Sequence, residues 1–227
     1  ERAGICIDGP TAWGQGTVAA AVAQRLGYGC LDSGAMYRIT ALAATRAGLP
    51  IDAEHAAQIA TLARQLPVRF EGGQVWLGND DVTDAIRTEE AGMNASRVSA
   101  LAAVRAALVD LQHSFRRLPG LVADGRDMGT VIFPGAALKV YLTASAACRA
   151  ERRYQQLIAK GLTATIADLR ADLEARDARD MSRSVAPLTP AQDALVLDNS
   201  ELTIEQAVDQ VLDWWQQRQP FTPGVQG

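Results

Sequence analysis

A glycine-framed loop near the start of the chain has the residue types and spacing of a phosphate-binding site. It begins at Gly9, reads Gly-Pro-Thr-Ala-Trp-Gly-Gln-Gly-Thr and ends at Thr17. Backbone N–H groups in such a loop, together with the positive end of the helix behind it, hold phosphate oxygens. A lysine usually follows the second glycine and reaches the outer phosphates, but this chain has the uncharged Gln15 there. The loop therefore predicts nucleotide phosphate binding, but the missing positive charge at Gln15 puts catalysis in question.

Arginines gather at a second place, residues 149–183, although only two of the 22 basic residues of the chain are lysines. Arg176, Arg179 and Arg183 recur every three or four residues, so they share one face of a helix. Stacked like charges repel unless an anion neutralises them, which favours a polyphosphate ligand. The alternative is that Asp177 and Asp180 pair with these arginines and leave less charge for a ligand.

Two further motifs combine phosphate-binding and acceptor groups. Residues 32–38 read Asp-Ser-Gly-Ala-Met-Tyr-Arg at the start of an expected helix, and residues 124–127 read Asp-Gly-Arg-Asp at an expected strand end. The alternatives are an ordinary helix cap with an exposed arginine and a tight turn with a surface ion pair. A phosphate loop with a distant arginine cluster suggests two phosphate-bearing ligands, because phosphoryl transfer relies on positioning and charge neutralisation.

The elements that must position these motifs alternate along the chain. Apolar runs predict strands at 4–8, 29–32, 121–123, 138–142 and 195–197. Helical patterns fall at 17–26, 35–47, 52–66, 101–115, 146–160, 165–177 and 203–217. This alternation predicts an α/β fold with a mostly parallel sheet flanked by helices. Ligands bind at the carboxyl ends of such strands, where Gly9, Asp32 and residues 124–127 fall.

Residues 67–86 interrupt this pattern. Short strand-like runs at 68–70, 74–77 and 81–83 are separated by glycine-containing turns, which predicts a small antiparallel insertion.

Composition excludes several other classes. The 227 residues are 48% hydrophobic and 21% charged, with a net charge of −4, which disfavours nonspecific nucleic-acid binding. No apolar stretch is long enough to span a bilayer, and we expect no signal peptide because the first residues belong to a strand. The first residue, Glu1, indicates a processed or trimmed N-terminus or a piece of a longer chain. Three widely spaced cysteines form no metal or disulfide pattern, and the reducing cytoplasm fits them.

Taken together, the chain resembles the bacterial cytidylate kinases, which are nucleoside-monophosphate kinases of the P-loop fold. The most specific matching stretches are residues 31–38, 86–88, 104–105, 123–134 and 176–187. The resemblance implies transfer of the ATP γ-phosphate to CMP or dCMP with Mg²⁺, in pyrimidine nucleotide metabolism. It also implies a monophosphate-binding region that carries the small antiparallel insertion and a short helical lid.

The resemblance assigns roles to particular residues of this chain. Contacts to ATP are expected from Gly9, Pro10, Thr11, Ala12, Trp13, Gly14, Gln15, Gly16, Thr17, Arg152 and Arg179. Contacts to the acceptor are expected from Asp32, Ser33, Tyr37, Arg38, Asn94, Arg105, Arg126, Asp127, Arg176, Asp180 and Arg183. Catalytic roles fall to Gln15, Arg126, Asp127, Arg176 and Arg183, and no protein ligand to a metal is assigned.

The expected domain organisation follows from the same resemblance. Residues 1–34, 98–148 and 187–227 would form the core P-loop domain. Residues 35–97 would form the CMP-binding region, with the insertion at about 67–86, and residues 149–186 would form the lid. We expect a cytoplasmic monomer that binds ATP and CMP or dCMP, with no nucleic-acid or membrane partner.

Three positions depart from the family pattern. Gln15 replaces the lysine of the phosphate loop, Met93 stands where an asparagine usually contacts the nucleotide, and Met181 replaces a polar lid residue. We expect the adjacent Asn94 to bind the nucleotide in place of residue 93. The first hypothesis is a cytidylate kinase, slowed by Gln15. The alternative is a nucleotide-binding relative impaired in phosphate transfer, and a third hypothesis is a kinase for UMP or another small acceptor.

Overall fold

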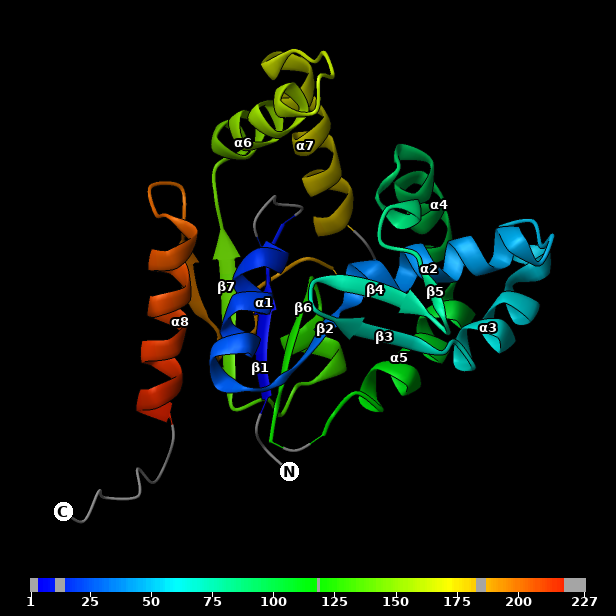
Figure 1. Ribbon diagram of the computed structural model, residues 1–227, viewed down its shortest axis with the longest axis horizontal. Coiled ribbons are helices and arrows are strands. Elements are labelled where there is room, and N and C mark those ends of the chain that lie inside the picture. The colour runs from blue at the N-terminus through cyan, green and yellow to red at the C-terminus, as the bar shows by residue number, and fades with distance from the viewer. Residues whose placement is uncertain (1–3, 11–14, 118, 183–186, 219–227) are drawn as a thin grey trace. The chain divides into compact units, whose positions relative to one another are not determined.

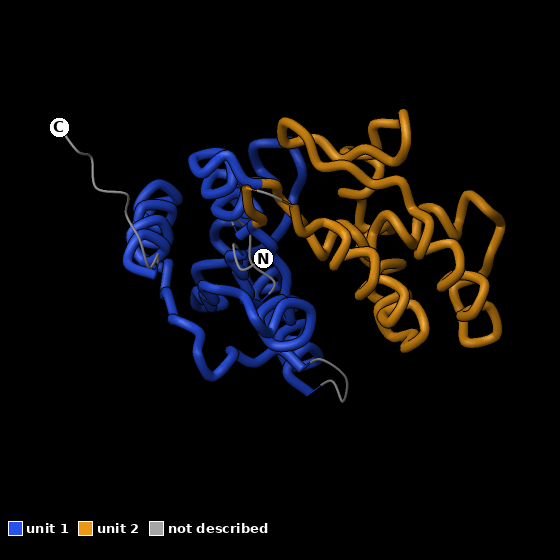
Figure 2. Tube along the Cα trace, turned by 90° about the horizontal axis from the view of Figure 1, so that it is seen from below, with its two compact units in different colours: residues 1–28, 122–227 blue, residues 29–121 orange. Residues whose placement is uncertain are grey.

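The computed structural model describes residues 4–10, 15–117, 119–182 and 187–218 of the chain. The chain divides into two compact units, which Figure 2 colours separately. The first unit contains residues 1–28 and 122–227, and the second contains residues 29–121.

A five-stranded sheet has the order β2-β6-β1-β7-β8, and its β1–β7 and β7–β8 pairs are parallel. The strands are β1 (Gly4–Asp8), β2 (Gly29–Asp32), β6 (Leu121–Gly125), β7 (Leu138–Thr143) and β8 (Leu195–Asp198). Ile5 lies opposite Leu138, and Val140 lies opposite Leu195. The apolar residues of β1 are fully buried, as expected for a central strand with helices on both faces. The carboxyl end of β1, where the phosphate loop begins, therefore lies in the middle of the sheet edge.

The helices of the first unit pack in pairs. They are α1 (Gln15–Leu26), α6 (Ala146–Ala159), α7 (Ile166–Met181) and α8 (Ile204–Arg218), with a π-helix at Met128–Ile132. Helix α1 packs against α8, and α6 packs against α7 to form a helical hairpin beyond β7 (Figure 1). A capping box starts α8, in which the Thr203 N–H donates to Gln206 Oε1 at 2.9 Å and the Gln206 N–H donates to Thr203 Oγ1 at 3.1 Å.

The second unit combines helices with a three-stranded antiparallel sheet of order β3-β4-β5. Its helices are α2 (Ser33–Arg46), α3 (Ala56–Arg64), α4 (Glu89–Ser99) and α5 (Ala102–His113), with 3₁₀ helices at Ala53–His55 and Ala85–Arg87. Its strands are β3 (Val68–Glu71), β4 (Gln74–Leu77) and β5 (Asp80–Asp81). Gly72 and Gly73 form the β3–β4 turn with φ of 59° and 76°, a conformation that suits glycine.

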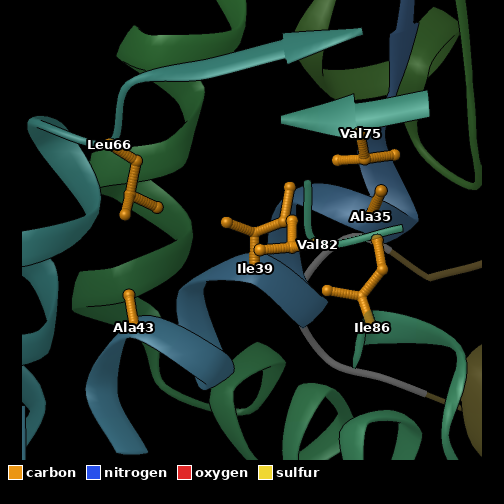
Figure 3. Close-up of a cluster of buried hydrophobic side chains, with 7 residues drawn as sticks. All are labelled: Ala35, Ile39, Ala43, Leu66, Val75, Val82 and Ile86. Atoms are coloured by element: carbon orange, nitrogen blue, oxygen red, sulfur yellow. The ribbon is translucent and has the colours of Figure 1, made fainter. Parts of the chain in front are cut away.

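A cluster of buried side chains joins this sheet to α2. Figure 3 shows its seven members, which are Ala35, Ile39, Ala43, Leu66, Val75, Val82 and Ile86. Three come from α2, and Val75 comes from β4. The insertion therefore shares a hydrophobic core with the helix that carries Tyr37 and Arg38.

The predicted α/β class, its parallel sheet and its small antiparallel insertion are confirmed. Three details differ from the prediction. The single helix expected at 52–66 is a 3₁₀ helix capped by Asp52 followed by α3. Helix α4 was not predicted, although Thr88 caps it by accepting a hydrogen bond from the Ala91 N–H at 3.1 Å. Helix α7 runs on to Met181.

Within the described ranges, the structure holds no helix with both the length and the apolar character needed to cross a bilayer.

Candidate functional site

The phosphate loop begins where the sheet leaves no room for a side chain. A Cβ atom on Gly9 would lie 2.1 Å from the backbone oxygen of Leu142 in β7, so only glycine fits there. Gly9 and Pro10 follow β1, and Gln15 begins α1, which gives the strand–loop–helix order that a phosphate loop requires. The remaining loop residues, Thr11, Ala12, Trp13 and Gly14, lie outside the described residues.

Gln15 is buried at the base of this loop, with 7% of its surface exposed. Its amide nitrogen donates to the backbone oxygen of Ile7 at 2.9 Å and to that of Gly125 at 2.7 Å. These bonds use both amide hydrogens and connect the start of α1 to the ends of β1 and β6. The side chain that stands at the usual lysine position is therefore held by the protein backbone in this structure.

Two oxygen-bearing side chains lie beside the same helix start. Asp124, at the end of β6, is buried, and a Cβ on Gly16 would lie 3.6 Å from its Oδ2. Thr17 is exposed in the first turn of α1. Carboxylate and hydroxyl oxygens are donors that Mg²⁺ accepts in phosphate sites, so these residues fit a magnesium ion.

Asp8 fixes the loop that follows β6. Its two carboxylate oxygens accept hydrogen bonds from the Met128 and Gly129 N–H groups, both at 2.8 Å. Burial, with a smaller contribution from neighbouring Asp127, raises the pKa of Asp8 to about 6, although the two N–H bonds oppose this rise. The π-helix Met128–Ile132 thus begins on a buried carboxylate that comes from the strand ahead of the phosphate loop.

The Asp-Gly-Arg-Asp motif begins in the last two residues of β6 and leads into that π-helix. Arg126 forms an ion pair with Asp180 of α7 at 2.5 Å, while Asp127 is buried with 5% of its surface exposed. The structure therefore brings together two predicted acceptor residues that lie 54 positions apart in the chain.

The arginines of the α6–α7 hairpin fall into two groups. Arg149 is buried and forms a two-pronged ion pair with Asp177, and Arg152 donates to the backbone oxygen of Asn199 at 2.7 Å. No ion pair between described residues involves Arg176 or Arg179. Arg183 lies outside the described residues.

Two acidic residues of α7, Asp177 and Asp180, pair with arginines of other elements. Asp177 binds Arg149 of α6, and Asp180 binds Arg126 after β6. These two carboxylates therefore hold the hairpin and the β6 loop, rather than pairing with the arginines of their own helix.

The second unit contains the predicted acceptor contacts on α2, α4 and α5. Asp32 caps α2 by accepting from the Ala35 N–H at 3.0 Å, and burial raises the pKa of its carboxyl group. The Arg105 guanidinium lies over the Tyr37 ring, 5.4 Å from its centroid, and donates to the Ser99 backbone oxygen at 3.3 Å.

The other predicted residues of this unit lie on α2 itself or on α4. Arg38 donates to the backbone oxygen of Ile86 at 2.7 Å, and Ser33 is buried at the start of α2. Asn94 is half-buried on α4, which packs against α2.

Sequence reasoning missed Asp8 and Arg149 as organising residues. An acidic residue directly before the first glycine of the loop, at the end of an apolar strand, is a usable signal for Asp8. For Arg149 the only signal is its place in the arginine-rich stretch, because its partner Asp177 is 28 positions away.

Comparisons with known proteins agree over nearly the whole chain. A family model described as cytidylate kinase matches residues 5–217. The chain is 57% identical over 212 residues to a cytidylate kinase of Polynucleobacter asymbioticus, covering 93% of this chain and 96% of that protein. It is 57% identical over 211 residues to a cytidylate kinase of Cupriavidus necator, covering 93% and 94%. It is 55% identical over 215 residues to a cytidylate kinase of Chromobacterium violaceum, covering 95% and 96%.

Among solved structures, an uncharacterized protein from Eubacterium ventriosum has a similar fold. The TM-score is 0.51 at 9% identity, and the alignment covers 96% of this chain and 99% of that one. This likeness concerns the fold alone. The family match over residues 5–217, with relatives above half identity across their length, shows that the chain belongs to the cytidylate kinase family.

Proposed function

We propose that this chain transfers the γ-phosphate of ATP to CMP or dCMP, giving CDP or dCDP. The observation that carries the proposal is the family match over residues 5–217, together with relatives named cytidylate kinase at 55–57% identity. The strand–loop–helix at Gly9–Thr17 and the arginines of the α6–α7 hairpin are the two features that such a reaction needs.

In the proposed reaction, a phosphate oxygen of CMP attacks the γ-phosphorus of ATP in line with the bond that breaks. The new P–O bond forms as the bond to the oxygen bridging the β- and γ-phosphates breaks, and ADP leaves. The acceptor phosphate is already anionic, so no residue of the chain has to remove a proton from it. The protein contributes position and positive charge.

Positive charge would come mainly from arginines, because the loop has none at residue 15. Arg176 and Arg179 lie on α7 outside any ion pair of the described residues, and their spacing puts them on one helix face. Arg126 is anchored by Asp180 and Arg152 by Asn199, which orients both guanidinium groups. We propose that these four arginines and Arg183 surround the transferring phosphate.

Gln15 has a positioning role in this proposal. Its amide holds the start of α1 against the backbone of β1 and β6, so it sets the loop without adding charge. Magnesium would be held by Thr17, Asp124 and the phosphates of ATP, and it would neutralise phosphate charge when bound.

We propose that the acceptor contacts are those expected from the resemblance to the family. They are Asp32, Ser33, Tyr37, Arg38, Asn94, Arg105, Arg126, Asp127, Arg176, Asp180 and Arg183. We further propose that residues 149–186 act as the lid, that residues 35–97 form the CMP-binding region, and that the protein works as a monomer in the cytoplasm, which its three free cysteines suit.

A coupled assay of ADP release tests the proposed function. The purified protein is given ATP, Mg²⁺ and one acceptor at a time, namely CMP, dCMP, UMP or AMP. The proposal predicts the highest kcat/KM with CMP or dCMP. A higher kcat/KM with UMP or AMP would contradict it, and no transfer to any acceptor would leave a nucleotide-binding protein that is impaired in catalysis.

A further inference from the structure

The small sheet β3-β4-β5 contributes no residue to the proposed reaction, yet it leads directly into a residue that binds Arg38. The Arg38 guanidinium donates to the backbone oxygen of Ile86 at 2.7 Å. Ile86 lies in the 3₁₀ helix Ala85–Arg87, five residues after β5 ends at Asp81. We infer that this sheet positions Arg38 for the acceptor phosphate, through the carbonyl group of Ile86. The inference rests on the proposed function, which makes Arg38 an acceptor contact.

Main-chain hydrogen bonds attach the segment 82–86 to β4. The Val82 N–H donates to the backbone oxygen of Val75 at 2.9 Å, and the Ile86 N–H donates to that of Val82 at 3.1 Å. The Thr83 hydroxyl adds a second attachment, since it accepts from the Val75 N–H at 2.9 Å and donates to Asp81. The position of the Ile86 carbonyl therefore follows the position of β4.

Apolar packing fixes the same segment against α2. Val82 is fully buried and Ile86 is 4% exposed, and both belong to the buried cluster that includes Ala35 and Ile39 of α2 (Figure 3). Protein interiors are packed densely, so removing a methyl group here shifts or loosens its neighbours. Ala35 is only three residues before Arg38 on the same helix, which places this packing close to the guanidinium that it would orient.

A carbonyl partner suits an arginine that must bind a phosphate. A backbone carbonyl carries no net charge, so this bond directs the guanidinium group without cancelling its positive charge. The ion pair between α2 and the sheet is different, because Arg46 binds the carboxylate of Asp80 at 2.7 Å and both side chains are about half exposed. Such a surface pair adds little to stability.

A merely structural role predicts a different response to mutation. If the Arg38–Ile86 bond only stabilises the unit, any loss of packing in the cluster should act alike. Leu66 offers the matched control, because it belongs to the same cluster but lies on the side of Ala43, away from Ile86 (Figure 3). Val82→Ala loosens the segment that carries the Ile86 carbonyl, while Leu66→Ala creates a larger cavity elsewhere.

The experiment compares Val82→Ala, Thr83→Val and Leu66→Ala with the wild-type chain, each checked for folding by circular dichroism. KM for CMP, KM for ATP and kcat come from the coupled assay, and the Kd for CMP comes from calorimetry. We expect the KM and Kd for CMP to rise about tenfold in Val82→Ala and about threefold in Thr83→Val, the scale of a weakened charged hydrogen bond. Leu66→Ala should stay within about twofold, and KM for ATP should not change.

A double-mutant cycle separates positioning from general loosening. Arg38→Met raises the Kd for CMP, and adding Val82→Ala to it should raise the Kd no further, because the sheet then has no arginine to position. Additive effects in the cycle would overturn the inference, and so would equal effects of Val82→Ala and Leu66→Ala on the Kd for CMP.

The same measurements distinguish this inference from the proposed function. Wild-type chain that binds CMP but transfers no phosphate to it would contradict the proposed function, while the Kd values would still decide the inference. Wild-type chain that binds no CMP would overturn both.

Discussion

The base of the phosphate loop and the α6–α7 hairpin differ in the charge that their side chains carry. In the loop, Gln15 is neutral and its amide hydrogens are taken by two backbone carbonyls. In the hairpin, Arg149 is paired with a carboxylate, while Arg176 and Arg179 have no ion pair among the described residues. One region is held together by neutral hydrogen bonds, and the other carries positive charge on a helix face.

This difference separates positioning from charge neutralisation. In the usual phosphate loop one lysine contributes to both, because it lies at the loop and carries the charge. Here the loop would position ATP through its backbone and Gln15, and the hairpin would supply the charge. Phosphoryl transfer depends on the summed positive charge around the transferring group, so such a division is chemically sufficient if the arginines reach it.

Removing charge from the hairpin should have the largest effect. Arg176→Met should lower kcat by about a hundredfold or more, because it removes a cation from the developing phosphate charge. The coupled assay with ATP and CMP measures this. Arg170→Met is the matched control on the same helix, since Arg170 is exposed and already paired with Glu174. It should change kcat by less than about twofold, and equal losses in the two variants would contradict the assigned role of Arg176.

The loop base should respond to pH through Asp8. Its pKa is raised by burial from 3.8 to about 6 in the folded chain, so the folded state holds a proton that the unfolded state has released at intermediate pH. The contribution of Asp8 to the free energy of unfolding is therefore fully present below about pH 4. It is lost as the pH rises through about 6, by up to about 3 kcal/mol.

Asp8→Asn removes this titration and provides the reference. The unfolding free energy of the wild-type chain, minus that of Asp8→Asn, should fall between about pH 4 and pH 7 in urea titrations. A difference that stays constant or rises over this range would show that Asp8 does not hold a raised pKa.

Two buried glutamines provide the smallest and most specific test. Gln15 has two carbonyl partners, whereas the amide group of Gln112, fully buried on α5, has no hydrogen-bond partner among the described residues. Gln112→Met should raise the unfolding free energy by about 1 kcal/mol, because it removes an unsatisfied buried amide at similar volume. Gln15→Met should lower it by about 1–2 kcal/mol, because it removes two satisfied bonds. Urea titrations measure both, and a change of the same sign at the two positions would contradict the comparison.

Local patterns were sufficient to predict much of the fold. Strands β1 and β7 are apolar runs bounded by turn residues, and the capping box at Thr203 marks the start of α8, as its spacing predicts. The π-helix could not be found in this way. It depends on the Asp8 carboxylate, which reaches Met128 from 120 positions away.

The types of residue in the candidate site could be predicted from the sequence, but the partners of those residues could not. Spacing along α7 correctly placed Arg176 and Arg179 on one helix, but the partners of Asp177 and Asp180 come from α6 and from the loop after β6. Likewise, the approach of Arg105 to Tyr37 joins α5 to α2 through tertiary packing, which no local pattern encodes.

The most direct test of the division between loop and hairpin is a coupled phosphotransfer assay with ATP, Mg²⁺ and CMP, run in parallel on the wild-type chain and on Gln15→Lys. If the arginines supply the charge, the wild-type chain is active and the two kcat values lie within about tenfold, less than a cation at a phosphoryl group usually contributes. Activity in Gln15→Lys alone would contradict this account, since it would show that the loop needs its own cation.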